Sequence, residues 1–179
     1  MYFSKVLVVI SALIVLAASK VVKVQNKRSN SLLVSVGGSE YTVAANSVVA
    51  VTLDDEWSGS ISAIPVDAEV TDGPKTQIDF SLSTAEDSYS VSLLNGFNLP
   101  VKVIATGSTA CTSSVCAANI LRVCPTDSQV LNSTGTVVAC QNSPLVMSNL
   151  CPLAVVDELT SIANVQKCTS AVGYLVLFV

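Results

Sequence analysis

Short apolar runs interrupted by small polar residues follow one another along the chain from residue 21 to its end. Val, Ile, Tyr and Phe recur within these runs, and Gly, Asn, Pro and Ser separate them, which is the pattern that β-strands produce. It predicts strands at residues 32–36, 41–43, 47–53, 89–93, 99–104 and 174–179. Many short strands at close spacing are typical of a sandwich or barrel, so we expect an all-β fold.

Helical patterns are sparse, and we expect at most one or two short helices. The clearest pattern covers residues 114–123, where small and aliphatic residues stand between two cysteines and Pro125 ends the run. A second short helix is expected after Pro152. The apolar ending, residues 174–179, is shorter than the hydrophobic tail of a lipid-anchor signal. We therefore expect it to be a buried terminal strand.

The N-terminus has the pattern of a secretory signal peptide. Lys5 precedes an apolar run, residues 6–18, and Ala17-Ala18-Ser19 offers a signal-peptidase site. Cleavage there would remove residues 1–19 and leave residues 20–179, which we expect to form a single domain of a secreted, extracellular protein. The alternative is an uncleaved membrane anchor, which the apolar run disfavours because it falls short of the ~20 residues that span a bilayer.

The charge balance excludes several classes of partner and catalyst. The net charge is −4, and loss of Lys5 with the signal segment takes it to −5. Nucleic acids and anionic membranes bind clusters of Lys and Arg, and none is visible, so we expect neither partner. The chain has no histidine, which rules out Ser-His-Asp and Cys-His catalysis. We expect no cofactor and no metal.

All six cysteines lie in the second half of the chain, at positions 111, 116, 124, 140, 151 and 168. An even number in an exported chain predicts three disulfides, although sequence alone leaves 15 connectivities open. A zinc site is the alternative. It is disfavoured by the absence of histidine and of any Cys-x-x-Cys pair.

Two segments in the middle of the chain resemble the thaumatin-like family. Residues 79–82, Asp-Phe-Ser-Leu, resemble its Glu-Phe strand. Residues 89–100, Tyr-Ser-Val-Ser-Leu-Leu-Asn-Gly-Phe-Asn-Leu-Pro, are similar to its Tyr-Asp-Val-Ser-Leu-Val-Asp-Gly-Phe-Asn-Leu-Pro stretch. Residues 57–61, Trp-Ser-Gly-Ser-Ile, resemble its Trp-Ser-Gly-Arg-Ile stretch, and the cysteine spacing from Cys111 to Cys124 resembles its cysteine block. The chain is identified as a shortened, degenerate member of the osmotin and thaumatin type.

The resemblance implies a flattened β-sandwich with disulfide-linked loops and a specific cysteine pairing. The implied pairs are Cys111 with Cys168, Cys116 with Cys151, and Cys124 with Cys140. The family's bridge between its first and last strands falls on Arg28 and Val179, so both of its cysteines are lost. Only 26 residues separate Cys124 from Cys151, which implies that the family's loop-rich second domain is strongly reduced.

The family's acidic cleft, which is linked to β-1,3-glucan binding, implies where a site would lie. Asp79 matches its Glu, Ser90 and Asn95 match two of its aspartates, and Ser60 matches its Arg. Its closing acidic pair aligns loosely with Asp157 and Glu158. Most of the cleft's charge is therefore missing. We expect a non-catalytic, defence-related module that binds a wall polysaccharide of β-1,3-glucan type, with a weak endo-β-1,3-glucanase using Asp79 as one alternative.

Several further interpretations stay open at this level. Trp57, Tyr89 and Phe97 could stack on a sugar ring, with core packing as the alternative for each. The acidic runs 54–56 and 86–87 could supply a second carboxylate, but they are more simply solvated loops. A decayed sugar site on a protein-binding or effector-like scaffold would show an exposed apolar patch away from the former cleft. Asn132-Ser133-Thr134 predicts a glycosylated loop, and we expect a monomer.

Overall fold

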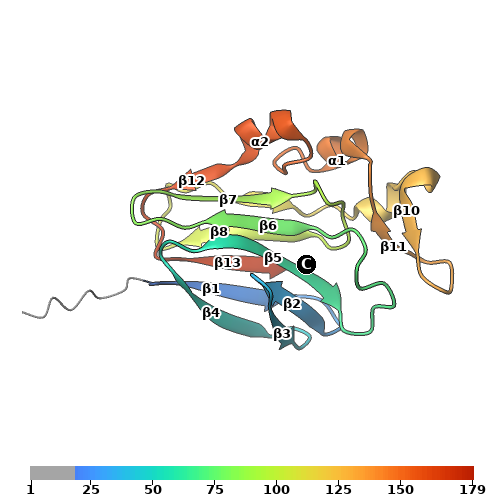
Figure 1. Ribbon diagram of the computed structural model, residues 1–179, viewed down its shortest axis with the longest axis horizontal. Coiled ribbons are helices and arrows are strands. Elements are labelled where there is room, and N and C mark those ends of the chain that lie inside the picture. Colours follow the sequence, from blue (N-terminus) through green and yellow to red (C-terminus); the bar gives the residue numbers. More distant parts are fainter. Residues whose placement is uncertain (1–18) are drawn as a thin grey trace, which may run out of the picture.

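Two β-sheets that share one hydrophobic core make up most of the protein. The computed structural model describes residues 19–179 (Figure 1). The predicted signal segment, residues 1–19, lies outside the described residues apart from Ser19. Within the described part of the chain, no helix is long and apolar enough to cross a bilayer.

The first sheet has five strands in the order β4-β1-β13-β8-β9. Its strands are β1 (Ser19–Asn26), β4 (Val48–Asp54), β8 (Val101–Thr106), β9 (Ser114–Cys116) and β13 (Gly173–Phe178). The last strand, β13, lies in the middle, parallel to β1 and antiparallel to β8. Its residues alternate between buried and half-buried positions, which confirms the expected buried terminal strand.

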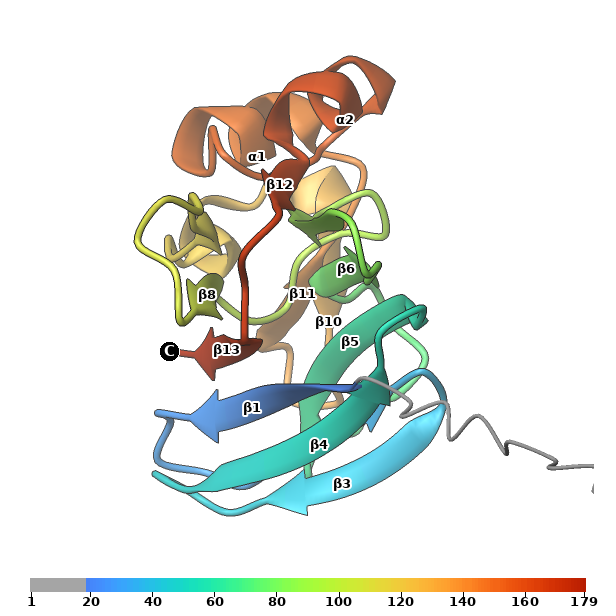
Figure 2. The same ribbon diagram turned by 90° about the vertical axis from the view of Figure 1, so that its left-hand side faces the viewer.

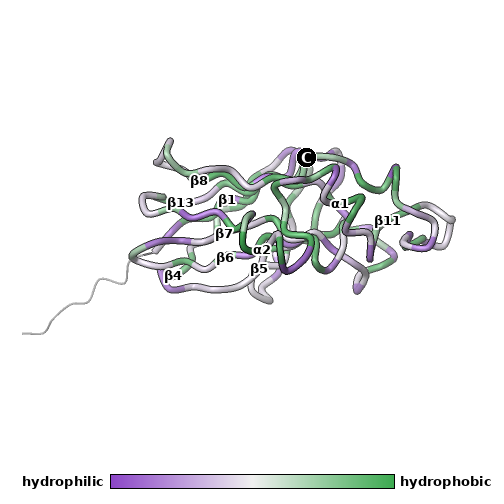
Figure 3. Tube along the Cα trace, turned by 90° about the horizontal axis from the view of Figure 1, so that it is seen from above, coloured by the Kyte–Doolittle hydropathy of each residue, from purple (hydrophilic) through white to green (hydrophobic). Residues whose placement is uncertain are grey.

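The second sheet has six strands in the order β12-β7-β6-β5-β2-β3. Its strands are β2 (Leu32–Val36), β3 (Ser39–Val43), β5 (Ser58–Pro65), β6 (Gln77–Ser81), β7 (Asp87–Ser92) and β12 (Gln166–Cys168). The alternation of hydrophobic and hydrophilic residues along the chain can be followed in Figure 3. One face of each strand thus points into the core, and all six strands expected from this pattern are confirmed.

Short elements cover one end and one edge of this sandwich. The helices α1 (Pro144–Leu150) and α2 (Glu158–Asn164) lie beyond β7 and β12, away from β3 (Figure 2). A small ribbon pairs β10 (Gln129–Leu131) with β11 (Val137–Cys140), next to the 3-10 turns η1 (Ile120–Val123) and η2 (Thr126–Ser128). The fold is thus the expected all-β sandwich with two short α-helices.

The helix expected at residues 114–123 is wrong. Its first part is β9, which pairs with β8, and only its last four residues form a single 3-10 turn, η1. Backbone pairing with β8 and the disulfide at Cys116 hold the segment extended, and they override a weak local helical preference. The second expected helix, after Pro152, is α2, whereas α1 was not anticipated from the sequence.

The three disulfides implied by the family resemblance are confirmed. Cys111 joins Cys168, Cys116 joins Cys151 and Cys124 joins Cys140, with Cα atoms 5.4, 4.9 and 5.8 Å apart. No cysteine is left free. Each bridge of this kind stabilises a fold by about 2–4 kcal/mol, chiefly by restricting the unfolded chain.

A hydrogen bond stands where the family has its bridge between the first and last strands. Nη1 of Arg28 donates to the carbonyl oxygen of Val179 over 3.0 Å, and the backbone N–H of Lys27 donates to Phe178 over 2.8 Å. These two positions are therefore neighbours in space, as the family's bridge implies. In this chain, noncovalent polar contacts join the two positions.

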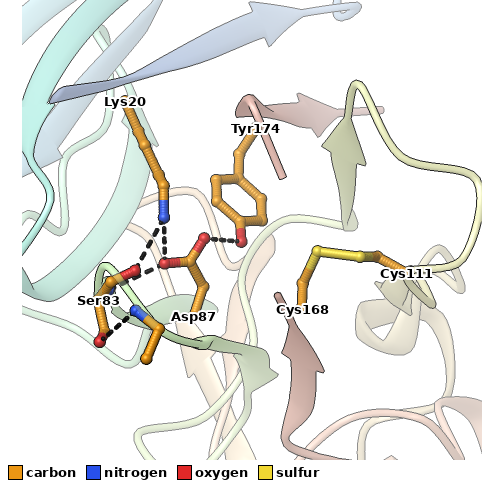
Figure 4. A network of polar contacts seen from close by, with 7 residues as sticks. Lys20, Ser83, Asp87, Cys111, Cys168 and Tyr174 are labelled. Atoms are coloured by element: carbon orange, nitrogen blue, oxygen red, sulfur yellow. Dashed lines mark hydrogen bonds and ion pairs between the residues drawn. A yellow bond between two sulfur atoms is a disulfide. The ribbon is translucent and has the colours of Figure 1, made fainter. Parts of the chain in front are cut away.

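A buried carboxylate ties the two sheets together. Asp87 on β7 is 1% exposed, and its Oδ1 lies 2.5 Å from Nζ of Lys20 on β1 (Figure 4). The hydroxyl of Tyr174 on β13 donates to Oδ2 over 2.6 Å, and the backbone N–H of Ser83 donates to Oδ1 over 2.9 Å. Burial and the adjacent carboxylate raise the pKa of Tyr174 far above its usual value, so this phenol remains a donor.

Asp87 is therefore not part of a solvated loop, as its place in the acidic run suggested. Glu86 fits that interpretation, because it pairs with Lys167 over 2.9 Å at the surface, where both side chains are well exposed. The two neighbouring acids differ because successive residues of an extended chain point to opposite faces.

These two adjacent carboxylates give a matched stability test. We expect Asp87→Ala to lower the free energy of unfolding by about 3–5 kcal/mol, because it leaves the Lys20 ammonium without its buried partner. Glu86→Ala removes an exposed pair and should cost no more than about 1 kcal/mol. Urea unfolding at neutral pH measures both, and equal losses would show that the buried carboxylate has no special structural role.

Candidate functional site

The positions that match the family's cleft lie side by side on the outward face of the six-stranded sheet. Asp79 on β6 is directly opposite Ser60 on β5 and Ser90 on β7 in the strand register. Their common face is set by alternation, because Ile78 and Phe80, which flank Asp79, are buried in the core. The sheet thus brings together three of the residues that the resemblance singled out, of which Ser60 and Asp79 are half-buried and Ser90 is buried, only 4% exposed.

Asp79 is the one carboxylate in this row, and its surroundings favour the protonated form. Its side chain is half-buried, and burial raises its pKa, an effect that a hydrogen bond with Ser92 partly opposes. Ser92 lies opposite Gln77, one pleat along the same face. The residues opposite Asp79 on both neighbouring strands are serines, so the register supplies no second carboxylate beside it.

A polar cavity of about 410 Å³ continues this face, and Asn95 lies in its wall. Nδ2 of Asn95 donates to Oε1 of Gln77 over 2.5 Å, and the backbone carbonyl oxygen of Asn95 accepts from the backbone N–H of Lys75 over 3.1 Å. Besides these residues, hydroxyl, carboxylate and amide groups line the cavity, contributed by Ser62, Asp72 and Gln141. We call this the polar cavity.

Gly96 holds the turn that presents Asn95. Its φ is +92°, and a Cβ there would stand 2.5 Å from Cβ of Pro74 and 2.6 Å from the carbonyl oxygen of Cys140. Only glycine meets both constraints without strain. The Asn-Gly pair is therefore fixed by backbone conformation and close packing, and Asn95 is carried with it to the cavity wall.

Sequence reasoning missed Gln77, Lys75 and Gln141. Gln77 precedes Asp79 by two residues, so strand alternation could have identified it as a neighbour on the same face. Lys75 and Gln141 come from loops after β5 and β11, and only the tertiary fold brings them together. No local sequence pattern indicates that Lys75 and Gln141 lie close together.

The aromatic candidates lie elsewhere. Tyr89 is 1% exposed, its ring packs edge-on against Tyr174 with centroids 5.0 Å apart, and its hydroxyl donates to the carbonyl oxygen of Thr112. It faces the core because it alternates with Ser90 along β7, so the idea that its ring stacks on a sugar is wrong. Phe97 is fully buried as well.

Trp57 packs against the protein's own backbone. A Cβ at Gly59 would lie 2.7 Å from its ring, and one at Gly37 would lie 3.1 Å away. Gly59 is opposite Phe80, a core residue, so the ring covers the core-facing side of this sheet and not the side that carries Asp79. Trp57 also contacts the core cluster. Of the five candidates, Asp79, Ser90 and Asn95 are on the same side.

The remaining acidic and polar candidates have structural surroundings of their own. Asp157 caps the N-terminus of α2, accepting from the backbone N–H of Thr160 over 2.7 Å, and these bonds lower its pKa. Residues 54–56 run from the end of β4 into the turn before β5; Asp54 and Glu56 are exposed, whereas Asp55 is half-buried and its Oδ1 has no hydrogen-bond partner among residues 19–179. Asn132 lies in the β10–β11 turn, where its Oδ1 accepts from the backbone N–H and the hydroxyl of Thr134. Its glycosylation stays a prediction.

Residues 19–179 contain no group of three or more His, Cys, Asp or Glu side chains placed to hold a metal ion. The candidate site itself offers hydroxyls, amides, one ammonium and two carboxylates, which donate and accept hydrogen bonds.

Comparison with known proteins agrees with the cysteine pattern and the fold. A family model described as the Thaumatin family matches residues 63–152. Thaumatin-like protein 1 of Pyrus pyrifolia is 33% identical over 115 residues, which cover 63% of this chain and 46% of that protein. A protein of Prunus avium named glucan endo-1,3-beta-glucosidase is 43% identical over 70 residues, which cover 37% of this chain and 29% of that protein. The match thus spans less than half the length of either relative.

Among solved structures, the protein elicitor MoHrip2 from Magnaporthe oryzae has a similar fold. It superposes with a TM-score of 0.51 over 89% of this chain and 98% of that chain, with 12% of residues identical. At this level of identity the likeness concerns the fold alone.

The raised pKa of Asp79 has a consequence for stability. A folded state that holds the proton more tightly than the unfolded state loses stability as the pH rises through about 4, the ordinary carboxyl value, to the raised folded value. Asp79→Asn removes this loss. The free energy of unfolding of the variant, relative to that of the wild type, should therefore rise between pH 3 and pH 7. We expect the rise to be less than about 1 kcal/mol, because the carboxyl group is partly exposed to screening solvent.

Urea unfolding of both proteins at the two pH values measures this difference. Asp54→Asn, which removes the same charge from an exposed turn, is the control. If the stability of Asp79→Asn relative to the wild type fell as the pH rises, the raised pKa of Asp79 would be contradicted.

Proposed function

The chain belongs to the thaumatin family, and we propose from this that it is a secreted, defence-related protein that binds a wall polysaccharide of β-1,3-glucan type without hydrolysing it. The three disulfides suit an oxidising, extracellular compartment, as does the apolar segment at the N-terminus. The relative named glucan endo-1,3-beta-glucosidase supports glucan as the polysaccharide.

The observation that carries the proposal is the row of polar groups on the outward face of β5, β6 and β7. Ser60 and Asp79 lie in register and are partly exposed, Ser90 beside them is buried, and Gln77 and Asn95 continue the row into the polar cavity. Sugar hydroxyls both donate and accept hydrogen bonds. Hydroxyl and amide side chains can do both as well, and a carboxylate accepts. Such a face binds a neutral saccharide without needing the charge that a full acidic cleft would provide.

The same row argues against catalysis. Hydrolysis of a glycosidic bond normally uses two carboxyl groups about 5–9.5 Å apart, one of which donates a proton. Asp79, with its raised pKa, has the character of the acid, but the residues opposite it are serines. The glucanase alternative would need a second carboxylate from another segment. It predicts release of reducing ends from a soluble β-1,3-glucan that disappears in Asp79→Asn, whereas we expect no release from either protein.

A protein-binding role is the second candidate, because exposed aliphatic residues gather on α1 and α2. Leu145, Leu159 and Ile162 are 79%, 81% and 84% exposed, and α2 contributes no residue to the core. Leu159 and Ile162 are three positions apart, so they lie on the same face of the helix. Neighbouring exposed aliphatic side chains are a common mark of protein-binding surfaces.

One retention experiment separates these two roles. We expect the wild-type protein to be retained by insoluble β-1,3-glucan in moderate salt. The double variant Gln77→Ala/Asn95→Ala removes two amide side chains and should bind about tenfold more weakly, since each lost hydrogen bond is worth about 0.5–1.5 kcal/mol. The double variant Gln25→Ala/Thr52→Ala, on the outward face of the other sheet, is the matched control.

A third variant, Leu159→Ser/Ile162→Ser, should leave retention unchanged. Loss of retention in this variant alone would favour the helices as the binding surface. Free passage of the wild-type protein would refute the proposed polysaccharide role.

A further inference from the structure

A second cavity, of about 280 Å³, shares residues 73–75 with the polar cavity but has a different character. It lies between the loop after β5 and the β10–β11 ribbon. Aliphatic side chains make up much of its wall: Ile64, Val70, Leu99, Leu121 and Ala139. We propose that this cavity binds small amphipathic carboxylates, with the apolar body against these side chains and the carboxylate on Arg28 and Lys75.

The charged residues that line the cavity differ in exposure. Arg28 and Lys75 are half-buried, whereas the two acidic residues of the wall, Asp67 and Glu69, are exposed. The carboxylate of Glu69 accepts from the backbone N–H of Ser133 over 2.8 Å, which lowers its pKa and directs it toward the β10–β11 turn. The two cations are thus less exposed than the two carboxylates, and the cavity favours an anionic group.

Neither cation has a side-chain carboxylate partner within the described residues. The two ion pairs between side chains among residues 19–179 join Lys20 to Asp87 and Lys167 to Glu86, so no side-chain carboxylate there pairs with Arg28 or Lys75. An incoming carboxylate gains from two half-buried cations that lack a side-chain counter-ion on an apolar wall, because its charge-assisted hydrogen bonds are screened less there than in water.

Arg28 is positioned for this contact by the chain end. Its Nη1 donates to the carbonyl oxygen of Val179, which holds the guanidinium in place. Its Nε is buried and donates to nothing in residues 19–179, and a buried donor without a partner is costly. A guanidinium offers five N–H groups in a planar fork that suits a carboxylate, so donors remain for a ligand.

The same features disfavour a neutral saccharide in this cavity. Sugar hydroxyls need polar partners around most of the ring, as the polar cavity offers, and aliphatic walls would leave them unsatisfied. The inference therefore concerns a ligand class different from the polysaccharide proposed above, and its test is independent of glucan binding.

Cinnamate, an apolar ring with one carboxylate, is the probe. We expect it to perturb backbone amide signals of Leu99, Leu121 and Ala139 in an NMR titration of the disulfide-bonded chain. Its neutral analogue cinnamamide should bind at least about tenfold more weakly, as expected when charge-assisted hydrogen bonds are lost. Arg28→Gln and Lys75→Gln should each weaken cinnamate binding by a similar factor.

The control is Lys102→Gln, which makes the same change at a half-buried lysine of β8 that lines neither cavity and should leave the affinity unchanged. Lys75→Gln keeps the test decisive if Arg28→Gln disturbs the chain end. Equal binding of the acid and the amide would overturn the proposal. So would an absence of binding, or signal changes centred on Gln77 and Asn95.

Discussion

The buried carboxylate of Asp87 is the constraint on which the relation between the two sheets depends. It belongs to the six-stranded sheet, and its partners Lys20 and Tyr174 belong to the first and last strands of the other. A charge removed from water must be paired and hydrogen-bonded to be tolerated, so the three strands can approach only in the arrangement that satisfies it. Lys20 would also be the first residue left by the signal cleavage that the sequence predicts. Cleavage one residue further along would remove the cation.

Much of the fold could be predicted from the sequence because alternation reports which face of a strand is buried. The six expected strands have this signal, and the family resemblance supplied the disulfide pairing that spacing alone left open. The helix expected at residues 114–123 was wrong because two tertiary contacts hold the segment extended: pairing with the preceding strand β8, and the disulfide to Cys151, 35 residues after Cys116. The acidic pair at 86–87 was misread for a related reason. The sequence shows two adjacent acidic residues, whereas the extended backbone directs Glu86 to the solvent and Asp87 into the core.

The candidate site was only partly within reach of the sequence. Asp79 and Ser90 were found because the family's motif marks them, and the register of β6 and β7 then places them opposite each other. The polar cavity also needs a loop after β5 and another after β11, whose meeting is a property of the whole fold. Tyr89 shows the opposite error. A residue inside a recognised motif was assigned to the surface, although the next position along the strand is the one that faces outward.

The parallel pairing of β1 with β13 governs the order in which the five-stranded sheet can be assembled. Its first strand has β4 on one side, but the neighbour on its other side is the last strand made, more than a hundred residues later. During synthesis, β1 and β8 must therefore wait with one edge unpaired until β13 has been made. Closing so long a loop is slow, and an open apolar edge invites association with other chains in the meantime. A nascent chain that stalls before its last strand thus cannot close this sheet, however complete its disulfides are.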